Sequence, residues 1–209
     1  MSIFILLRDF LYSPRRVFVW YNGKMEKLFI PLVLGTAREG RESEKVARFV
    51  FRELEKNTNI ETVFVDVRDH VVSCVTLPPW GSNGVDEKPT EWKKIAARAN
   101  AFIFVLPEYN HGYPGEWKLL LDSLYDEYAK KPVGLCGVSS GVFGGARMID
   151  LVKPTLVEVK MVPLRTALYF GNIKNAFDET GEPMDKQVYT RMRVFFDDLL
   201  WYAEALKVR

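Results

Sequence analysis

Metal-ligating and disulfide-forming residues are scarce in this chain of 209 residues. It contains two cysteines and two histidines, and they do not follow the ligand spacing of a zinc site. Cys74 and Cys136 each lie in an apolar run, where a buried free thiol is the usual interpretation. We therefore expect no metal site and no disulfide framework, and we expect a reducing compartment such as the cytoplasm.

Long apolar runs and a strong excess of one charge are also missing. No run approaches the roughly 20 apolar residues that cross a membrane as a helix, so we expect no membrane partner. The formal net charge is +2, but residues 1–27 carry +3 and the rest of the chain carries −1. Because the main body is near neutral and has no basic stripe, we also expect no nucleic-acid partner.

The N-terminal segment does not follow the pattern of the rest of the chain. Its apolar stretch IFILL is interrupted by charged residues and is too short for the core of a signal peptide. Met25 is followed at once by EKLFIPLVLG, which resembles the start of a domain. We expect residues 1–24 to lie outside the fold, with the natural start at Met25. The domain assignment is an N-terminal extension at 1–26 and one domain at 27–209.

Short apolar strands alternate with helical patterns from Lys27 onward. The expected strands are 28–35, 62–67, 101–106, 132–139 and 162–170. The expected helices are 43–56, 91–99, 116–128, 143–157 and 185–206. Apolar strands that are each followed by a helix indicate a parallel sheet covered on both faces. The pattern predicts a doubly wound α/β domain, whose ligand binds beyond the carboxyl ends of the strands.

The loop after the first expected strand, GTAREGRES at 35–43, contains groups that suit an anion. Thr36 and Ser43 offer hydroxyls, and Arg38 and Arg41 offer guanidinium groups that match phosphate oxygens in pairs. Amides at a helix start also favour an anion. A capped helix start with solvated arginines explains the same residues equally well, so both interpretations stay open.

The loop after the third expected strand, PEYNHGYPGEWK at 107–118, is rich in groups that suit a flat polar ligand. Pro107 ends the strand, and a polar, aromatic corner follows, with Gly112 allowing close approach to the backbone. The members of this corner are Tyr109, Asn110, His111 and Tyr113. His111 has no partner at catalytic spacing, so by itself it is interpreted as an ordinary loop histidine.

The loop after the fourth expected strand, GVSSGVFGGAR at 137–147, matches the G-x-S-x-G pattern of a hydrolase nucleophile. Both histidines of the chain precede this serine, whereas that fold places its histidine after it. Two other interpretations remain. Backbone amides at Gly141 and Gly144, with the hydroxyls of Ser139 and Ser140, suit the polar edge of a heterocycle. Alternatively, the glycines ease a turn and allow close packing.

Together the loops describe a phosphate, a flat ring and a polar ring edge, which is the shape of FMN. GTAREGRES, PEYNHGYPGEWK and SSGVFGG, in this order on this strand pattern, resemble the NADPH-dependent FMN reductase family of flavodoxin-like proteins. That family includes quinone, chromate and azo-dye reductases, and the resemblance covers about residues 27–206. It implies a flavodoxin-like three-layer sandwich with strand order 2-1-3-4-5, and a homodimer or homotetramer with the flavin near the subunit interface.

The resemblance also implies which residues meet non-covalently bound FMN. Thr36, Arg38 and Ser43 would lie at the phosphate, but a common family form has Ser-x-Arg-x-x-Ser there and this chain has a longer spacing to Ser43. Arg38, Arg41 and Ser43 therefore all stay candidates. Pro107 to His111 would line the ring system, largely through backbone. The full set of cofactor-binding candidates is Thr36, Arg38, Arg41, Ser43, Pro107, Glu108, Tyr109, Asn110, His111, Ser139, Ser140, Gly141 and Gly144.

The expected activity is hydride transfer from NADPH through FMN to a small acceptor, such as a quinone, a flavin, chromate or an azo compound. The flavin carries this chemistry, which explains why no catalytic acid–base pair is evident. Trp80 and Tyr109 are candidates to shape the open flavin face, and Trp80 and Tyr113 are the candidates for substrate binding. A hydrophobic plug on a surface loop explains Trp80 at least as well. The alternative is an FMN-binding electron carrier without pyridine-nucleotide activity, which the near-neutral body disfavours. A third possibility is a degenerate member that serves mainly as a protein partner.

Overall fold

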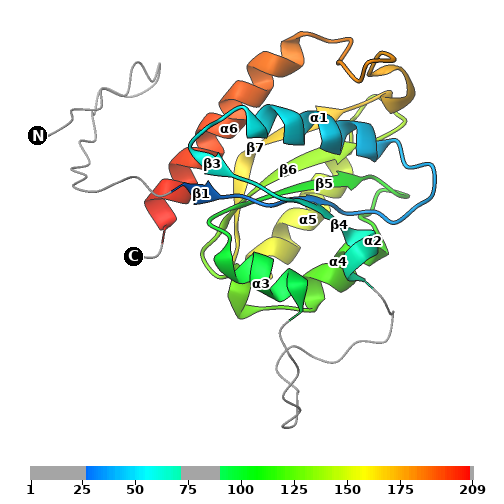
Figure 1. Cartoon of the computed structure of the whole chain (residues 1–209). Helices are drawn as coiled ribbons and strands as arrows, with labels where there is room; N and C mark the ends of the chain where they lie inside the picture. Colours follow the sequence, from blue (N-terminus) through cyan, green and yellow to red (C-terminus); the bar gives the residue numbers. More distant parts are fainter. Residues whose placement is uncertain (1–26, 72–89, 208–209) are drawn as a thin grey trace, which may run out of the picture.

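The computed structural model describes residues 27–71 and 90–207 (Figure 1). The strands are β1 (Leu28–Phe29), β2 (Leu32–Leu34), β3 (Ile60–Glu61), β4 (Phe64–Asp66), β5 (Phe102–Pro107), β6 (Pro132–Val138) and β7 (Val162–Phe170). The α-helices are α1 (Ser43–Glu55), α2 (Val67–His70), α3 (Glu91–Arg98), α4 (Gly115–Asp122), α5 (Ala146–Glu158) and α6 (Gln187–Leu206). Two short 3₁₀ turns, η1 (Asp126–Tyr128) and η2 (Ile173–Asn175), complete the set.

The main sheet has five parallel strands in the order β4-β2-β5-β6-β7, and β1 and β3 form a separate parallel pair. β1 and β2 come from the first predicted strand and β4 comes from the second, whereas β3 precedes the range predicted for the second strand. Counted in this way, the strand order is 2-1-3-4-5. The flavodoxin-like α/β fold predicted from the sequence is therefore confirmed.

The first predicted strand is divided in the structure, and the second is shorter than predicted. Pro31 lies between β1 and β2 and has no N–H to offer a ladder, but hydrogen bonds from the amides of Ile30 and Leu32 keep the chain beside the neighbouring segment. The second strand ends at Asp66, one residue earlier than predicted, because the Asp66 carboxylate accepts the Arg68 amide and begins α2. The sequence did not predict α2.

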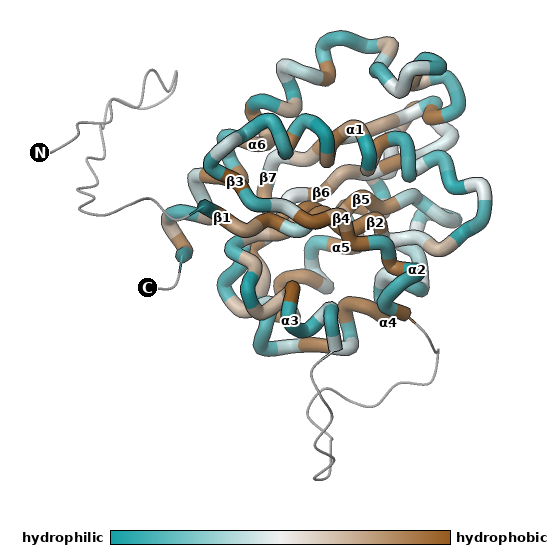
Figure 2. Tube along the Cα trace, in the orientation of Figure 1, coloured by the Kyte–Doolittle hydropathy of each residue, from teal (hydrophilic) through white to brown (hydrophobic). Residues whose placement is uncertain are grey.

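The helices cover both faces of the sheet. Residues of α1 and α6 pack in one apolar cluster, and residues of α3, α4 and α5 pack in the other. Figure 2 shows hydrophobic stretches along the central strands and hydrophilic ones on loops and outer helix faces. The α6 layer lies close to the sheet, since a Cβ at Gly134 would come within 2.3 Å of the Phe195 ring. Within the described residues, no helix is long and apolar enough to cross a bilayer.

This arrangement places the three loops of interest at one edge of the sheet. All five strands are parallel, so their carboxyl ends point the same way. Leu34 of β2 pairs with Val105 of β5, and Pro107 at the end of β5 pairs with Val138 of β6. The loops that follow β2, β5 and β6 therefore leave the sheet side by side, at the edge where ligands bind in this class of fold.

Candidate functional site

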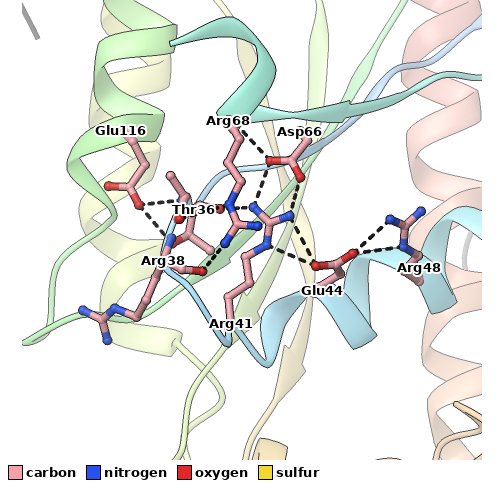
Figure 3. A network of polar contacts seen from close by, with 9 residues as sticks. Thr36, Arg38, Arg41, Glu44, Arg48, Asp66, Arg68 and Glu116 are labelled. Atoms are coloured by element: carbon pink, nitrogen blue, oxygen red, sulfur yellow. Dashed lines mark hydrogen bonds and ion pairs between the residues drawn. The ribbon is translucent and has the colours of Figure 1, made fainter. Parts of the chain in front are cut away.

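Arg41 is buried, and its guanidinium group is fully occupied. Nη1 donates to the Thr36 carbonyl at 2.5 Å and to Asp66 Oδ1 at 2.8 Å. Nη2 donates to Asp66 Oδ2 and to Glu44 Oε2, and Nε donates to the same Glu44 oxygen at 3.3 Å. Figure 3 shows this network. Because a guanidinium has five N–H groups, Arg41 has no donor left for a phosphate. Its hydrogen bonds to the Thr36 carbonyl and to Asp66 hold the loop in place instead.

The Asp66 carboxylate is held in its ionised form by this contact. Burial alone would raise the pKa of Asp66, but hydrogen bonds from the Arg41 guanidinium and the Arg68 amide outweigh burial and lower it. Asp66 occupies this position because β4 pairs with β2 so that Asp66 lies opposite Leu34, at the point where the loop begins. Sequence reasoning did not single out Asp66.

Arg38 differs from Arg41 in every respect that matters for binding an anion. Its side chain is exposed, and its Cζ lies 3.6 Å from the centroid of the Tyr109 ring, a cation–π contact. Among the described residues, its guanidinium makes no hydrogen bond or ion pair. The Arg68 guanidinium fixes the backbone here, donating to the carbonyls of Ala37 at 3.0 Å and Arg38 at 2.6 Å. Arg38 therefore presents free donors from a loop whose backbone is fixed.

Thr36 and Ser43 are both buried, but only Thr36 is satisfied. Thr36 Oγ1 lies 2.8 Å from the Tyr109 hydroxyl and 3.0 Å from Glu116 Oε1, to which it donates. The Ser43 hydroxyl, at the first residue of α1, is buried and has no hydrogen-bond partner within the described part of the chain. Buried polar groups are rarely left unpaired, so an anion accepting from the hydroxyl and amide of Ser43 fits this position, whereas the next two amides already donate to the Arg41 and Glu42 carbonyls.

The residues of this loop thus fit the phosphate of FMN. The loop carries free guanidinium donors at Arg38 and leads to the unpaired Ser43 hydroxyl at the start of α1, and each of these features favours an oxyanion. Glu116, which lies in the first turn of α4, was not singled out from the sequence. Its contacts with Thr36 and Ala37 were missed.

The loop after β5 forms a tight turn that projects polar side chains. The amides and carbonyls of Tyr109 and Gly112 bond to each other, at 2.9 and 2.8 Å. The two central residues, Asn110 and His111, have φ angles of 49° and 67° and are exposed. Tyr113 packs edge-on against Trp117 of α4, with 5.2 Å between the ring centroids, so it supports the loop at the margin of the core.

A salt bridge ties this loop to the start of α5. The Glu108 side chain is 8% exposed and accepts from Arg147 Nη1 at 3.1 Å and from the Met148 amide at 3.4 Å. The same Arg147 nitrogen lies 3.0 Å from Nε2 of His111. The loops after β5 and β6 are thereby held together. Arg147 was not among the predicted site residues, because its contacts are with residues 36 and 39 positions away.

The glycines of the loop after β6 have different roles. Gly144 has a φ of 60°, and a Cβ there would lie 2.8 Å from the Phe170 amide nitrogen. Packing therefore requires a glycine at position 144, in agreement with the packing interpretation given for this loop in the sequence analysis. A Cβ at Gly141 would meet nothing within 4 Å, and both Ser140 and Gly141 are exposed. This exposed end of the loop remains accessible to a ligand.

Ser139 does not have the surroundings of a hydrolase nucleophile. Its hydroxyl donates to the Gly141 carbonyl at 2.9 Å, which stabilises the turn. The two histidines make their contacts elsewhere: His70 lies against the Trp92 ring and His111 beside Arg147. Trp80 and Cys74 lie outside the described residues, and Cys136 is a buried free thiol.

Comparisons with known proteins agree with this geometry. The family model described as NADPH-dependent FMN reductase matches residues 30–178. An NAD(P)H-dependent FMN reductase of Schizosaccharomyces pombe is 31% identical over 145 residues, which are 66% of this chain and 72% of the relative. A quinone reductase of Pseudomonas putida is 29% identical over 167 residues, 75% of this chain and 85% of the relative.

Among solved structures, FerB of Paracoccus denitrificans, a flavoenzyme NAD(P)H:(acceptor) oxidoreductase, superposes with a TM-score of 0.67 at 21% identity. The match covers 86% of this chain and 98% of FerB, and at this identity it supports the fold alone. The family model, in contrast, spans well over half of the sequence and includes all three loops. The chain is therefore a member of the NADPH-dependent FMN reductase family, whose enzymes use FMN and NAD(P)H.

Proposed function

We propose that this protein transfers a hydride from NADPH to FMN bound at the carboxyl edge of the sheet, and from FMN to a small flat acceptor. The observation that carries the placement of the cofactor is the contrast between the two arginines of the first loop. Arg41 is saturated by Asp66, Glu44 and the loop itself, whereas the Arg38 guanidinium lies over the Tyr109 ring and makes no hydrogen bond or ion pair within the described residues.

In this proposal the side chains bind and orient, and FMN supplies the redox-active ring when bound. Arg38 and the hydroxyl and amide of Ser43 hold the phosphate. The segment from Pro107 to His111 lines the ring system, and Ser139, Ser140 and Gly141 meet its polar edge. The Glu108–Arg147 salt bridge keeps these two walls at a fixed separation. No protein nucleophile is required.

For the acceptor we propose a quinone, with free flavin, chromate and azo compounds as the alternatives. The support is the similarity to the Pseudomonas putida quinone reductase, which covers three quarters of this chain.

Two further proposals concern the oligomeric state and the cellular location of the protein. Val142 and Phe143 are 71% and 60% exposed beside the site, and a second copy of the chain would cover them in a homodimer. A buried free thiol at Cys136 suits the cytoplasm.

Steady-state oxidation of NADPH by the FMN-loaded protein tests this function. We expect 1,4-benzoquinone to give a higher kcat/KM than added free FMN, chromate or an azo dye, because a small flat ring can lie against the flavin. The control is the non-enzymatic rate of each acceptor with NADPH. Failure of every acceptor to accelerate NADPH oxidation would contradict the proposal and favour the electron-carrier alternative.

A further inference from the structure

We infer that Glu116 competes with the FMN phosphate for the hydroxyl of Thr36 and the amide of Ala37, and thereby sets how tightly this chain holds its cofactor. The inference rests on the phosphate position proposed above. It concerns a residue of α4 that lies about 80 positions from the loop it contacts, and it goes beyond the assignment of the chain to its family.

One oxygen of Glu116 makes both contacts. Oε1 accepts from the Ala37 amide at 2.7 Å and from Thr36 Oγ1 at 3.0 Å, and Figure 3 shows this carboxylate directed at the loop. Within the described residues, Glu116 forms no ion pair with a lysine or arginine. The carboxylate therefore takes from the loop two donors of the kind that bind a phosphate oxygen.

The hydrogen-bonding capacity of Thr36 makes the competition unavoidable. A threonine hydroxyl has one hydrogen to donate and two lone pairs to accept. Because the hydrogen goes to Glu116, the Tyr109 hydroxyl must be the donor in its own contact with Thr36, and the Arg38 amide is a further donor at 3.3 Å. Thr36 is thus saturated, and it can donate to a phosphate only after it releases Glu116.

Electrostatic repulsion between Glu116 and the phosphate also weakens the binding of FMN. A phosphate monoester carries about −1.5 to −2 at pH 7, and like charges at short range oppose each other. If Glu116 stays in place, the phosphate is left with Arg38 and Ser43, and it lies close to a second anion. If Glu116 moves away, its two hydrogen bonds must first be broken. In both cases Glu116 weakens binding of FMN and leaves binding of the uncharged ring unaffected.

The test compares the Kd of FMN with that of riboflavin, which lacks the phosphate, by quenching of flavin fluorescence. Glu116→Gln keeps one acceptor oxygen, removes the charge and replaces the other oxygen by an NH2 donor, whereas Glu116→Ala removes both the charge and the acceptors. We expect each variant to lower the Kd of FMN at least tenfold and to leave the Kd of riboflavin within twofold of the parent. Thermal unfolding without added flavin checks that each variant is folded.

A matched control is Glu55→Gln, which makes the same charge change at the exposed last residue of α1. It lies about 18 Å along the helix from Ser43, and we expect no change in either Kd. Parent-like or weaker FMN binding in both Glu116 variants would overturn the inference. If they weaken FMN and riboflavin alike, Glu116 organises the loop instead. Equal affinity of the parent for FMN and riboflavin would contradict the phosphate position itself.

Discussion

Replacing Asp66 with alanine is expected to lower the free energy of unfolding by about 3 kcal/mol, the lower end of the cost of removing one partner from a buried ion pair. The Arg41 side chain is 3% exposed, so its charge would be left buried without its main counter-ion. The same substitution removes the acceptor that begins α2. Urea denaturation, with the midpoint and slope fitted together, measures the change.

Two further variants show whether the lost ion pair is the cause. Asp122→Ala removes an aspartate from an exposed helical pair with Lys118, and we expect a change within about 0.5 kcal/mol. The double variant Arg41→Met/Asp66→Leu removes both charges, and we expect it to recover much of the lost stability, as buried pairs replaced by apolar residues often do. An Asp66→Ala variant as stable as Asp122→Ala would show that the pair is unimportant.

The same ion pair predicts part of the response to acid. The pKa of Asp66 is lowered in the folded chain, and its unfolded value is about 3.9. Its contribution to stability is therefore complete above the unfolded pKa and is lost as the pH falls through the lower, folded value. As the pH falls below about 4, the free energy of unfolding of the Asp66→Ala variant should therefore decrease less than that of the parent.

Replacing Arg38 with alanine is expected to weaken FMN binding by roughly 30-fold, or about 2 kcal/mol, which is typical of a charged hydrogen-bond donor. Arg38 is exposed and its guanidinium makes no hydrogen bond or ion pair among the described residues, so the stability of the fold should hardly change. The measurement is the Kd of FMN by fluorescence quenching at low and at high salt. The difference between variant and parent should narrow as salt screens the charges.

Arg98→Ala is the matched control for Arg38→Ala. Arg98 also stacks its Cζ 3.6 Å from an aromatic ring centroid, that of Phe29, but it ends α3 at the opposite edge of the sheet. We expect FMN affinity equal to that of the parent. If Arg38→Ala also binds FMN as the parent does, the phosphate lies elsewhere.

The sheet was predictable because its signal is local. Apolar runs marked every strand of the five-stranded sheet, and the last of them, Val162–Phe170, was predicted to the residue. Interruptions were harder to see. Pro31 divides the first strand, and the helix expected at 116–128 ends at Asp122 before resuming as η1. The 3₁₀ turn keeps Tyr128 buried, where its hydroxyl accepts from Trp92, a contact that no local pattern reveals.

The loops that form the site were predictable from the sequence, but the different roles of the residues within each loop were not. Arg38 and Arg41 stand three residues apart and are equivalent in sequence. What separates them is Asp66, 25 positions away from Arg41 and brought to it by the register of β2 and β4. Glu116 was missed for the same reason. Its role depends on Thr36, which only the folded sheet brings within hydrogen-bond distance.

The most direct test of hydride transfer at this site is an anaerobic titration of the FMN-loaded protein with NADPH, followed through the visible absorbance of the flavin. We predict that the absorbance bleaches completely at one equivalent of NADPH per bound FMN, and that adding a quinone restores it. Bound flavin that stays oxidised in excess NADPH would contradict the proposed reaction and indicate an electron carrier. A protein that binds no FMN would contradict the site.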